Sequence, residues 1–165
     1  MLFRSSVLFV GGGNASFYAL NALTGAIIWQ TSLGTSPDNF IWSSPVYYKG
    51  SIYIGLASLG DCPEVQGNLF RLNASTGAIQ NTFNVMPSGC TGGGVWGSPT
   101  IDASDGSVYF ATGNNDACSS SEPYATALVN VQASNLANTS YQEILGVPMP
   151  GRTLIGGVEL VFRKR

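Results

Sequence analysis

The most reactive side chains of this sequence are three cysteines, Cys62, Cys90 and Cys118, which follow one another at intervals of 28 residues. Thiols can form disulfides or bind metals as thiolates. A zinc site is not expected, because the sequence offers no Cys-x-x-Cys pair and no fourth ligand. Histidine is absent, which excludes Ser-His-Asp and Cys-His catalysis and any His-ligated metal. The odd number of cysteines leaves one thiol free, or paired outside this chain.

The composition indicates an all-β protein without a nucleic-acid surface. Hydrophobic residues make up 44% of the 165 residues, charged residues only 10%, and there are 21 glycines. Short apolar segments interrupted by glycine turns are typical of β-sheet proteins. The net charge is −2 with scattered basic residues, so nucleic acid is not an expected partner. Met1–Val10 is predicted to be a strand rather than a signal peptide, and no segment is long and apolar enough to span a membrane.

Two phrases of the sequence recur with a period slightly above fifty residues. Phe17–Ile27 is repeated at Leu69–Ile79, an offset of 52 residues. Between these copies, Trp42–Val46 is answered by Trp96–Thr100, an offset of 54. A weaker copy of the first phrase begins near Leu128 without its Thr-Gly pair. Two phrases that keep nearly the same period indicate a structural repeat.

Each repeat contains four short extended stretches, which predict one antiparallel blade of a β-propeller. Hairpin turns are expected at Gly50 and Gly106, because glycine accepts the positive φ that such turns require. We therefore predict two to three blades over residues 1–141. Propellers close with four to eight blades, so either the chain is a fragment of a longer protein, which we favour, or several copies assemble. Residues 142–165 depart from the pattern, and a truncated continuation of the third blade is one interpretation.

The repeat resembles that of the quinoprotein alcohol dehydrogenases, which use pyrroloquinoline quinone (PQQ). Ala19–Trp29 matches the family phrase Ala-x-Asp/Asn-x-x-Thr-Gly-x-x-x-Trp, in which the tryptophan packs between adjacent blades. The second copy has Asn81 where the tryptophan belongs. The stretch from Cys62 to Gly113 is most similar to the polyvinyl-alcohol-dehydrogenase branch of this family.

The same resemblance implies a cofactor site. Trp96 with the glycines before it, and Asn114 at the end of the stretch that begins at Val108, match family segments in which a tryptophan stacks on the quinone and an asparagine binds calcium. Glu64 occupies roughly the position of a calcium-binding glutamate. A planar quinone suits an aromatic floor, and calcium takes amide and carboxylate oxygens. The implied cofactors are therefore PQQ and Ca²⁺.

Purely structural interpretations compete with these roles. Trp96 shares its Trp-x-Ser-Pro phrase with Trp42, which packing alone explains. Asn114 suits a turn, and Glu64 suits a solvated loop. The aspartates of the predicted hairpin, Asp102 and Asp105, are assigned to turn formation rather than to metal binding. The family's catalytic aspartate is not visible in this sequence, so no catalytic residue is predicted and the chain alone is expected to be inactive.

The repeat geometry also bears on the cysteines. All three fall in loops that are expected on one face of the blades, the face that holds the cofactor in the resembling family. Cys90 lies in a loop between the two equivalent loops of Cys62 and Cys118, so a disulfide between Cys90 and one of these is expected. A disulfide points to a periplasmic or secreted protein.

Three functions remain in competition. The first is a fragment of a PQQ-dependent alcohol dehydrogenase-like propeller, whose partners would be the remaining blades or further copies, an alcohol and an electron acceptor. The second is a cofactor-free propeller scaffold for protein interaction, as in outer-membrane assembly. The third is a carbohydrate- or surface-binding propeller, because aromatic and asparagine-rich rims also suit sugars. The quinone and calcium residues discriminate among them.

Overall fold

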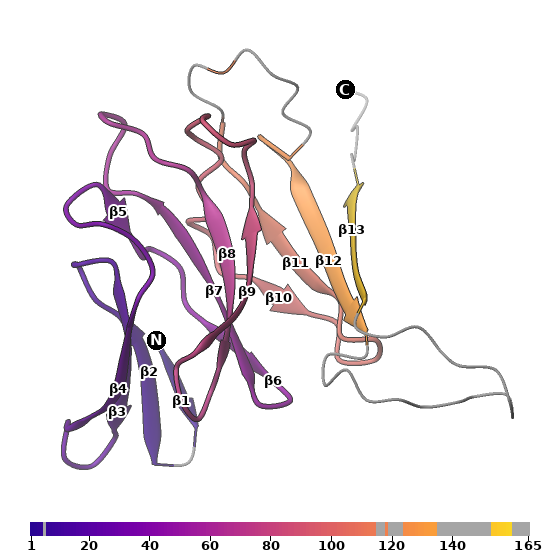
Figure 1. Ribbon diagram of the computed structural model, residues 1–165. Helices are drawn as coiled ribbons and strands as arrows, with labels where there is room; N and C mark the ends of the chain where they lie inside the picture. Colours follow the sequence, from indigo (N-terminus) through magenta and orange to yellow (C-terminus); the bar gives the residue numbers. More distant parts are fainter. Residues whose placement is uncertain (5, 115–117, 119–123, 135–152, 160–165) are drawn as a thin grey trace, which may run out of the picture.

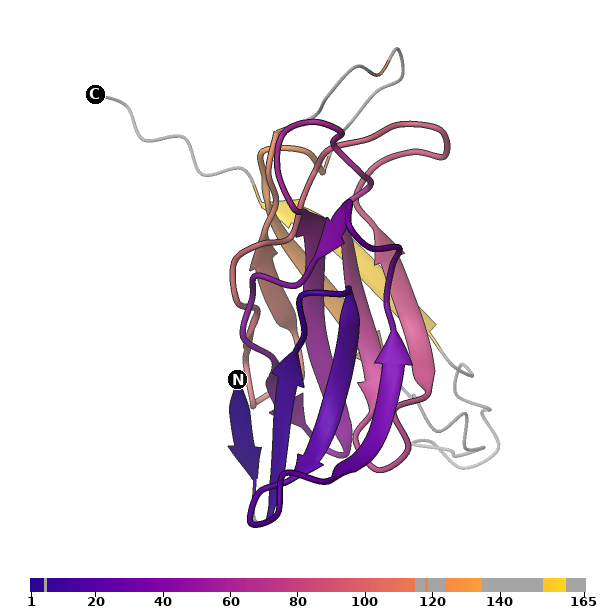
Figure 2. The same cartoon turned by 90° about the vertical axis from the view of Figure 1, so that its left-hand side faces the viewer.

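The structure, a computed structural model, describes residues 1–4, 6–114, 118, 124–134 and 153–159. This part of the chain consists of strands, turns and loops, and it contains no helix able to cross a membrane. The strands form three antiparallel sheets that lie side by side (Figure 1) and stack face against face when the molecule is turned (Figure 2).

Each sheet follows the chain as a simple meander. The first contains β1 (Leu2–Arg4), β2 (Val7–Gly11), β3 (Ser16–Asn21) and β4 (Ile27–Ser32). The second contains β6 (Val46–Tyr48), β7 (Ser51–Ser58), β8 (Asn68–Asn73) and β9 (Ile79–Asn84), with the short strand β5 (Asn39–Phe40) on the far end of β7. The third contains β10 (Thr100–Ile101), β11 (Val108–Ala111), β12 (Leu128–Ser134) and β13 (Thr153–Glu159). Four strands for each repeat agree with the predicted blades.

The turns between strands use the glycines that the repeat singled out. Gly50 and Gly106 have φ values of 81° and 82°, and Gly77 in the repeated Thr-Gly pair has 74°. Residues that carry a Cβ atom rarely adopt such positive φ values. Two other segments extend the predictions. Where one strand was expected, β1 and β2 form two paired strands. Strand β13 pairs with β12 along seven residues as the outer strand of the third sheet.

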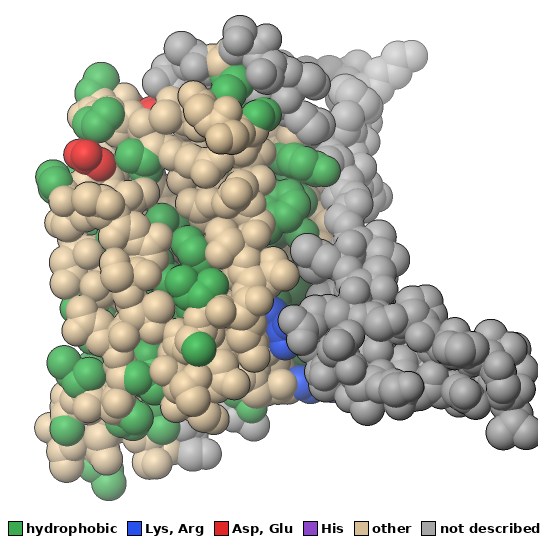
Figure 3. Space-filling model, in the orientation of Figure 1, with side chains coloured by type: hydrophobic (Ala, Val, Ile, Leu, Met, Phe, Trp, Pro, Cys, Tyr) green, Lys and Arg blue, Asp and Glu red, His purple; other side chains and the backbone are tan. Residues whose placement is uncertain are grey.

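The apolar residues form two cores, one in each gap between sheets. Strand β7 supplies both, because alternate side chains of a strand point to opposite faces. Ile52, Ile54 and Leu56 pack against the first sheet, whereas Tyr53 packs toward the third. All seven residues from Ser51 to Ala57 are buried, so this central strand lacks the polar alternation of a strand with a wet face. Charged side chains are correspondingly few on the surface seen in Figure 3.

Trp29 joins the first two sheets. Its indole Nε1 donates to the carbonyl of Ala74 at 3.1 Å, and its ring lies 5.8 Å from Phe9 and 6.0 Å from Phe17. A Cβ on Gly77 would approach the Trp29 ring to 2.5 Å, so the glycine is needed for this contact. The tryptophan thus packs between blades, as the resemblance implied.

The next gap lacks this tryptophan and uses another aromatic residue. Asn81 stands at the equivalent position. Two residues later on the same face of β9, Phe83 packs against Phe110 at 5.6 Å and Tyr124 at 5.2 Å between ring centroids. Phe83 therefore supplies at the second gap the aromatic contact that Trp29 supplies at the first.

We expect Trp29→Ala to lower the free energy of unfolding by about 3 kcal/mol, because a large partly buried ring and its hydrogen bond are lost. Urea denaturation followed by far-ultraviolet circular dichroism measures this. Trp29→Phe keeps an aromatic ring and should lose roughly half as much. A stability equal to that of Leu23→Ala, a change at a 90% exposed side chain, would contradict this role.

Candidate functional site

A pocket of about 330 Å³ opens where the ends of β7 and β11 meet. Its wall combines the end of β7 with the loop that follows, the Gly92–Trp96 segment, and the residues after β11. Glu64, Trp96 and Asn114 all line it. The structure therefore brings the three predicted site residues together, although they are separated by up to 50 positions in the sequence.

Trp96 presents its ring to the pocket rather than to the core. Its neighbour Val95 is fully buried in the second core, and the backbone N–H of Val95 donates to the carbonyl of Leu56 at 3.1 Å. The Trp96 side chain is 63% exposed. An anchored backbone with an exposed indole can offer a flat surface to a ligand, and core packing does not account for it.

Glu64 and Asn114 reach the pocket from opposite sides of one glycine segment. On one side, Gly92 N donates to Val65 O at 3.1 Å, directly after Glu64. On the other, Gly93 N donates to Asn114 O at 2.7 Å. Glu64 is half-buried and its Oε2 atom is buried, whereas Asn114 is exposed. The segment runs this close to its neighbour because of Gly67, where a Cβ would overlap the carbonyl oxygen of Gly93.

Two further pocket residues were not predicted. Trp42, the repeat partner of Trp96, also lines the pocket; its indole donates to Ser58 O at 2.9 Å, and its ring centroid lies 4.4 Å from that of Phe40. Asp61 adds an exposed carboxylate. The Trp-x-Ser-Pro repeat could have indicated Trp42, because equivalent residues of adjacent blades occupy equivalent places.

The chemistry of the lining is oxygen-rich and acidic. Asp61 and Glu64 supply carboxylates and Asn114 an amide, and the described lining residues include no Lys, Arg or His. Hard cations such as Ca²⁺ take carboxylate and amide oxygens, whereas zinc sites favour sulfur and nitrogen. This donor set suits Ca²⁺. No group of three or more His, Cys, Asp or Glu side chains suited to a metal occurs among the described residues, so a cation here would rely on amide or further oxygens.

Comparison with known proteins finds similarity to several alcohol dehydrogenases. It is 28% identical over 121 residues to a polyvinylalcohol dehydrogenase of Pseudomonas sp, covering 59% of this chain and 19% of that protein. It is 27% identical over 134 residues to the polyvinylalcohol dehydrogenase of Sphingopyxis sp. (strain 113P3), covering 67% and 20%. The quinohemoprotein alcohol dehydrogenase of Comamonas testosteroni superposes with a TM-score of 0.61 at 22% identity, over 76% of this chain and 24% of that one. The resemblance to quinoprotein alcohol dehydrogenases is confirmed.

The three sheets are accordingly blades of a quinoprotein-like β-propeller. No family model matches the chain. It spans about a fifth of the length of the curated relatives, and the structural likeness concerns the fold.

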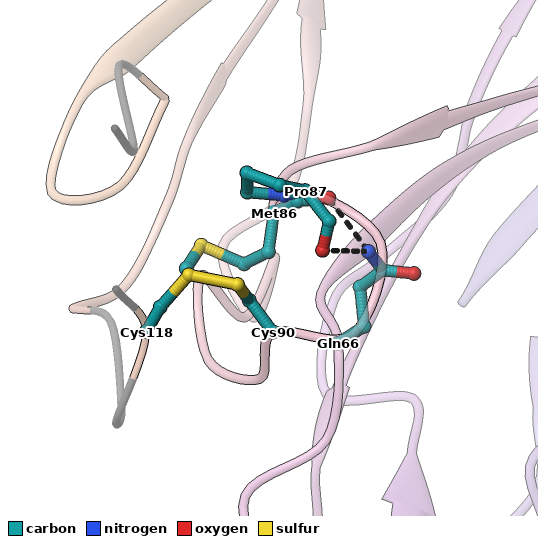
Figure 4. Close-up of a disulfide and its surroundings, with 5 residues drawn as sticks. All are labelled: Gln66, Met86, Pro87, Cys90 and Cys118. Carbon is teal, nitrogen blue, oxygen red and sulfur yellow. Dashed lines mark hydrogen bonds between the residues drawn. A yellow bond between two sulfur atoms is a disulfide. The ribbon is translucent and has the colours of Figure 1, made fainter. Parts of the chain in front are cut away.

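In these quinoprotein-like blades, Cys90 and Cys118 form a disulfide with Cα atoms 5.3 Å apart (Figure 4). Of the two pairings left open by the sequence, the structure contains this one, and Cys62 is an exposed free thiol. The disulfide joins Cys90, two positions before the pocket residue Gly92, to Cys118, four positions after the pocket residue Asn114.

The aspartates of the β10–β11 turn lie outside the pocket and organise the turn. Asp102 accepts from the amide and hydroxyl of Ser104 at 2.9 and 2.6 Å, and Asp105 accepts from those of Ser107 at 2.8 and 2.9 Å. The hydrogen bonds from Ser104, its hydroxyl first, lower the pKa of Asp102. Both carboxylates thus act in turn formation, as the sequence predicted.

Proposed function

We propose that these blades form part of a PQQ-dependent alcohol dehydrogenase, whose quinone and Ca²⁺ bind at the pocket between the second and third blades. The observation that carries the proposal is the meeting of Trp96, Glu64 and Asn114 in one pocket. Each matched a family segment separately in the sequence, and packing or turn formation alone gives no reason for the three to converge. When bound, PQQ supplies the acceptor for the hydride of an alcohol.

The residues of this chain have binding and positioning roles in the proposal. Trp96 provides the surface on which the quinone ring stacks. Glu64 and Asn114 provide oxygen ligands for the cation, with the half-buried Glu64 giving the stronger attraction because it carries a charge. Asp61, at the same wall, adds negative potential that draws the cation into the pocket.

Charge makes the cation necessary. PQQ carries carboxylates and is anionic at neutral pH, and the pocket presents Asp61 and Glu64 without a basic side chain among its described lining residues. Like charges repel, more strongly where water is partly excluded. A divalent cation held by Glu64 and Asn114 would offset this repulsion.

We therefore expect the full-length protein that contains these blades to bind PQQ in the presence of Ca²⁺ and not in the presence of a chelator. Isothermal titration calorimetry with PQQ, with and without Ca²⁺, measures this. Trp29→Phe is a suitable control, because its change lies between the first two blades and away from the pocket. If neither the folded parent protein nor its folded Trp29→Phe variant binds PQQ in the presence of Ca²⁺, a cofactor-free scaffold should replace this proposal.

The partners and compartment follow from the same proposal. An alcohol and an electron acceptor would be the reactants, and the remaining blades of the propeller, or further copies of the chain, would cover the outer sheet faces. The Cys90–Cys118 disulfide supports a periplasmic or secreted location, because disulfides persist in oxidising compartments.

A further inference from the structure

The central wall of the pocket is held on both sides by backbone hydrogen bonds. On the side of Glu64, the backbone N–H of Gly67 donates a hydrogen bond to the carbonyl oxygen of Gly92 at 2.9 Å. On the side of Asn114, Gly113 N donates to Gly94 O at 2.9 Å. The spacing between Glu64 and Asn114 is thus set through the Gly92–Gly94 segment.

Further contacts fix the loop that leads into this wall. Cys90 precedes Gly92 by two positions, and its disulfide ties it to Cys118, four positions after Asn114. The same loop is held on the Glu64 side by Gln66, whose Nε2 donates to Met86 O at 2.6 Å and to Pro87 O at 3.5 Å (Figure 4). The disulfide and the Gln66 amide therefore hold the loop from opposite sides.

Asn114 depends on such support because its own side chain is exposed and follows the end of β11. A cation needs all its oxygen ligands at about 2.3–2.6 Å at once. If the Asn114 segment moves by more than a few tenths of an ångström, its side-chain oxygen leaves this distance range and no longer binds the cation.

We propose that the Cys90–Cys118 disulfide, assisted by Gln66, is a positioning element of the pocket that keeps Asn114 and Glu64 close enough to bind one cation. The inference rests on the function proposed above and extends it to residues that touch neither cation nor quinone. Groups that orient metal ligands commonly change metal affinity by about ten- to a hundredfold when removed.

The test compares Ca²⁺ affinity of the chain in a Cys62→Ser background, which removes the exposed free thiol. By calorimetry, the double variant Cys90→Ser/Cys118→Ser should bind Ca²⁺ about tenfold or more weakly, and Gln66→Ala should also bind more weakly with the disulfide intact. Leu72→Ala, which removes a fully buried side chain from the first core, is the control for general loss of stability. It should leave the affinity unchanged.

A second measurement does not depend on any ligand. Hydrogen exchange at the Gly93 and Gly113 amides, which join the wall to the Asn114 segment, should accelerate more in the double serine variant than in Leu72→Ala, relative to the amides of the first sheet in the same variant. Unchanged exchange, or equal Ca²⁺ affinity in the double variant and its parent, overturns the positioning role. If the parent binds neither Ca²⁺ nor PQQ, the proposed function fails, and the exchange rates alone then decide whether the disulfide holds the wall.

Discussion

Glu64→Gln is expected to weaken Ca²⁺ binding by about a hundredfold and to remove Ca²⁺-dependent PQQ binding with it. The substitution keeps the shape of the side chain and one oxygen but removes its charge. Glu64 is half-buried with Oε2 out of contact with water, so its attraction for a cation is screened less than that of an exposed carboxylate. Affinity of a Ca²⁺ site follows the number of charged ligands and the rigidity of the site.

Calorimetric titration with Ca²⁺, and then with PQQ at saturating Ca²⁺, measures both effects. Asp102→Asn is the matched control, because it removes one negative charge in a turn at the opposite end of β11 while retaining the oxygen that Ser104 contacts. Asn114→Ala should weaken Ca²⁺ less than Glu64→Gln, since a neutral amide is lost. Equal affinities for Glu64→Gln and Asp102→Asn would show that Glu64 is not a ligand.

The local structure of the blades could be predicted from the sequence because it depends on short-range rules. Lys-Gly, Thr-Gly and Asp-Gly pairs favour turns between strands, and the glycines of these pairs, Gly50, Gly77 and Gly106, have positive φ values. The two repeated phrases then fix where strands begin and which side chains are equivalent. Trp96, Asn114 and Glu64 were predicted differently, from the resemblance of their segments to those of quinoprotein alcohol dehydrogenases.

The rest of the site depends on contacts between distant segments. Trp42 reaches the pocket because β5 pairs with the end of β7 and because Ser58 accepts its indole N–H. Neither contact leaves a local signal, so only the repeat equivalence of Trp42 to Trp96 could have indicated this residue. Asp61 lies in an irregular loop whose course no repeat fixes. The disulfide pairing remained open between two equivalent loops, since sequence spacing does not reveal which pair of Cα atoms approaches within reach.

A close approach between strand β7 and the segment that leads into the third blade gives Gly55→Ala a large expected effect on stability. Gly55 lies in the buried strand β7, where a Cβ would overlap the carbonyl oxygen of Val95 and lie 2.6 Å from its Cγ1 atom. Ser43 holds the backbone of Gly55 in place. Its hydroxyl accepts a hydrogen bond from the amide of Gly55 at 3.1 Å and donates one to the carbonyl of Gly55 at 3.3 Å. The backbone of residue 55 therefore cannot shift to relieve the overlap of the added methyl group with Val95 without breaking these hydrogen bonds.

We expect Gly55→Ala to lower the free energy of unfolding by about 4 kcal/mol, as overpacking against backbone in a core does. Urea denaturation gives the loss, and Gly97→Ala is the control, because a Cβ there meets nothing within 4 Å; it should change stability by less than about 0.5 kcal/mol. Any structure that survives in Gly55→Ala must push Val95 outward, and Trp96 with it, so PQQ binding should fall together with stability. Unfolding midpoints that coincide for the two alanine variants would show that the blades are not packed as closely as this pocket requires.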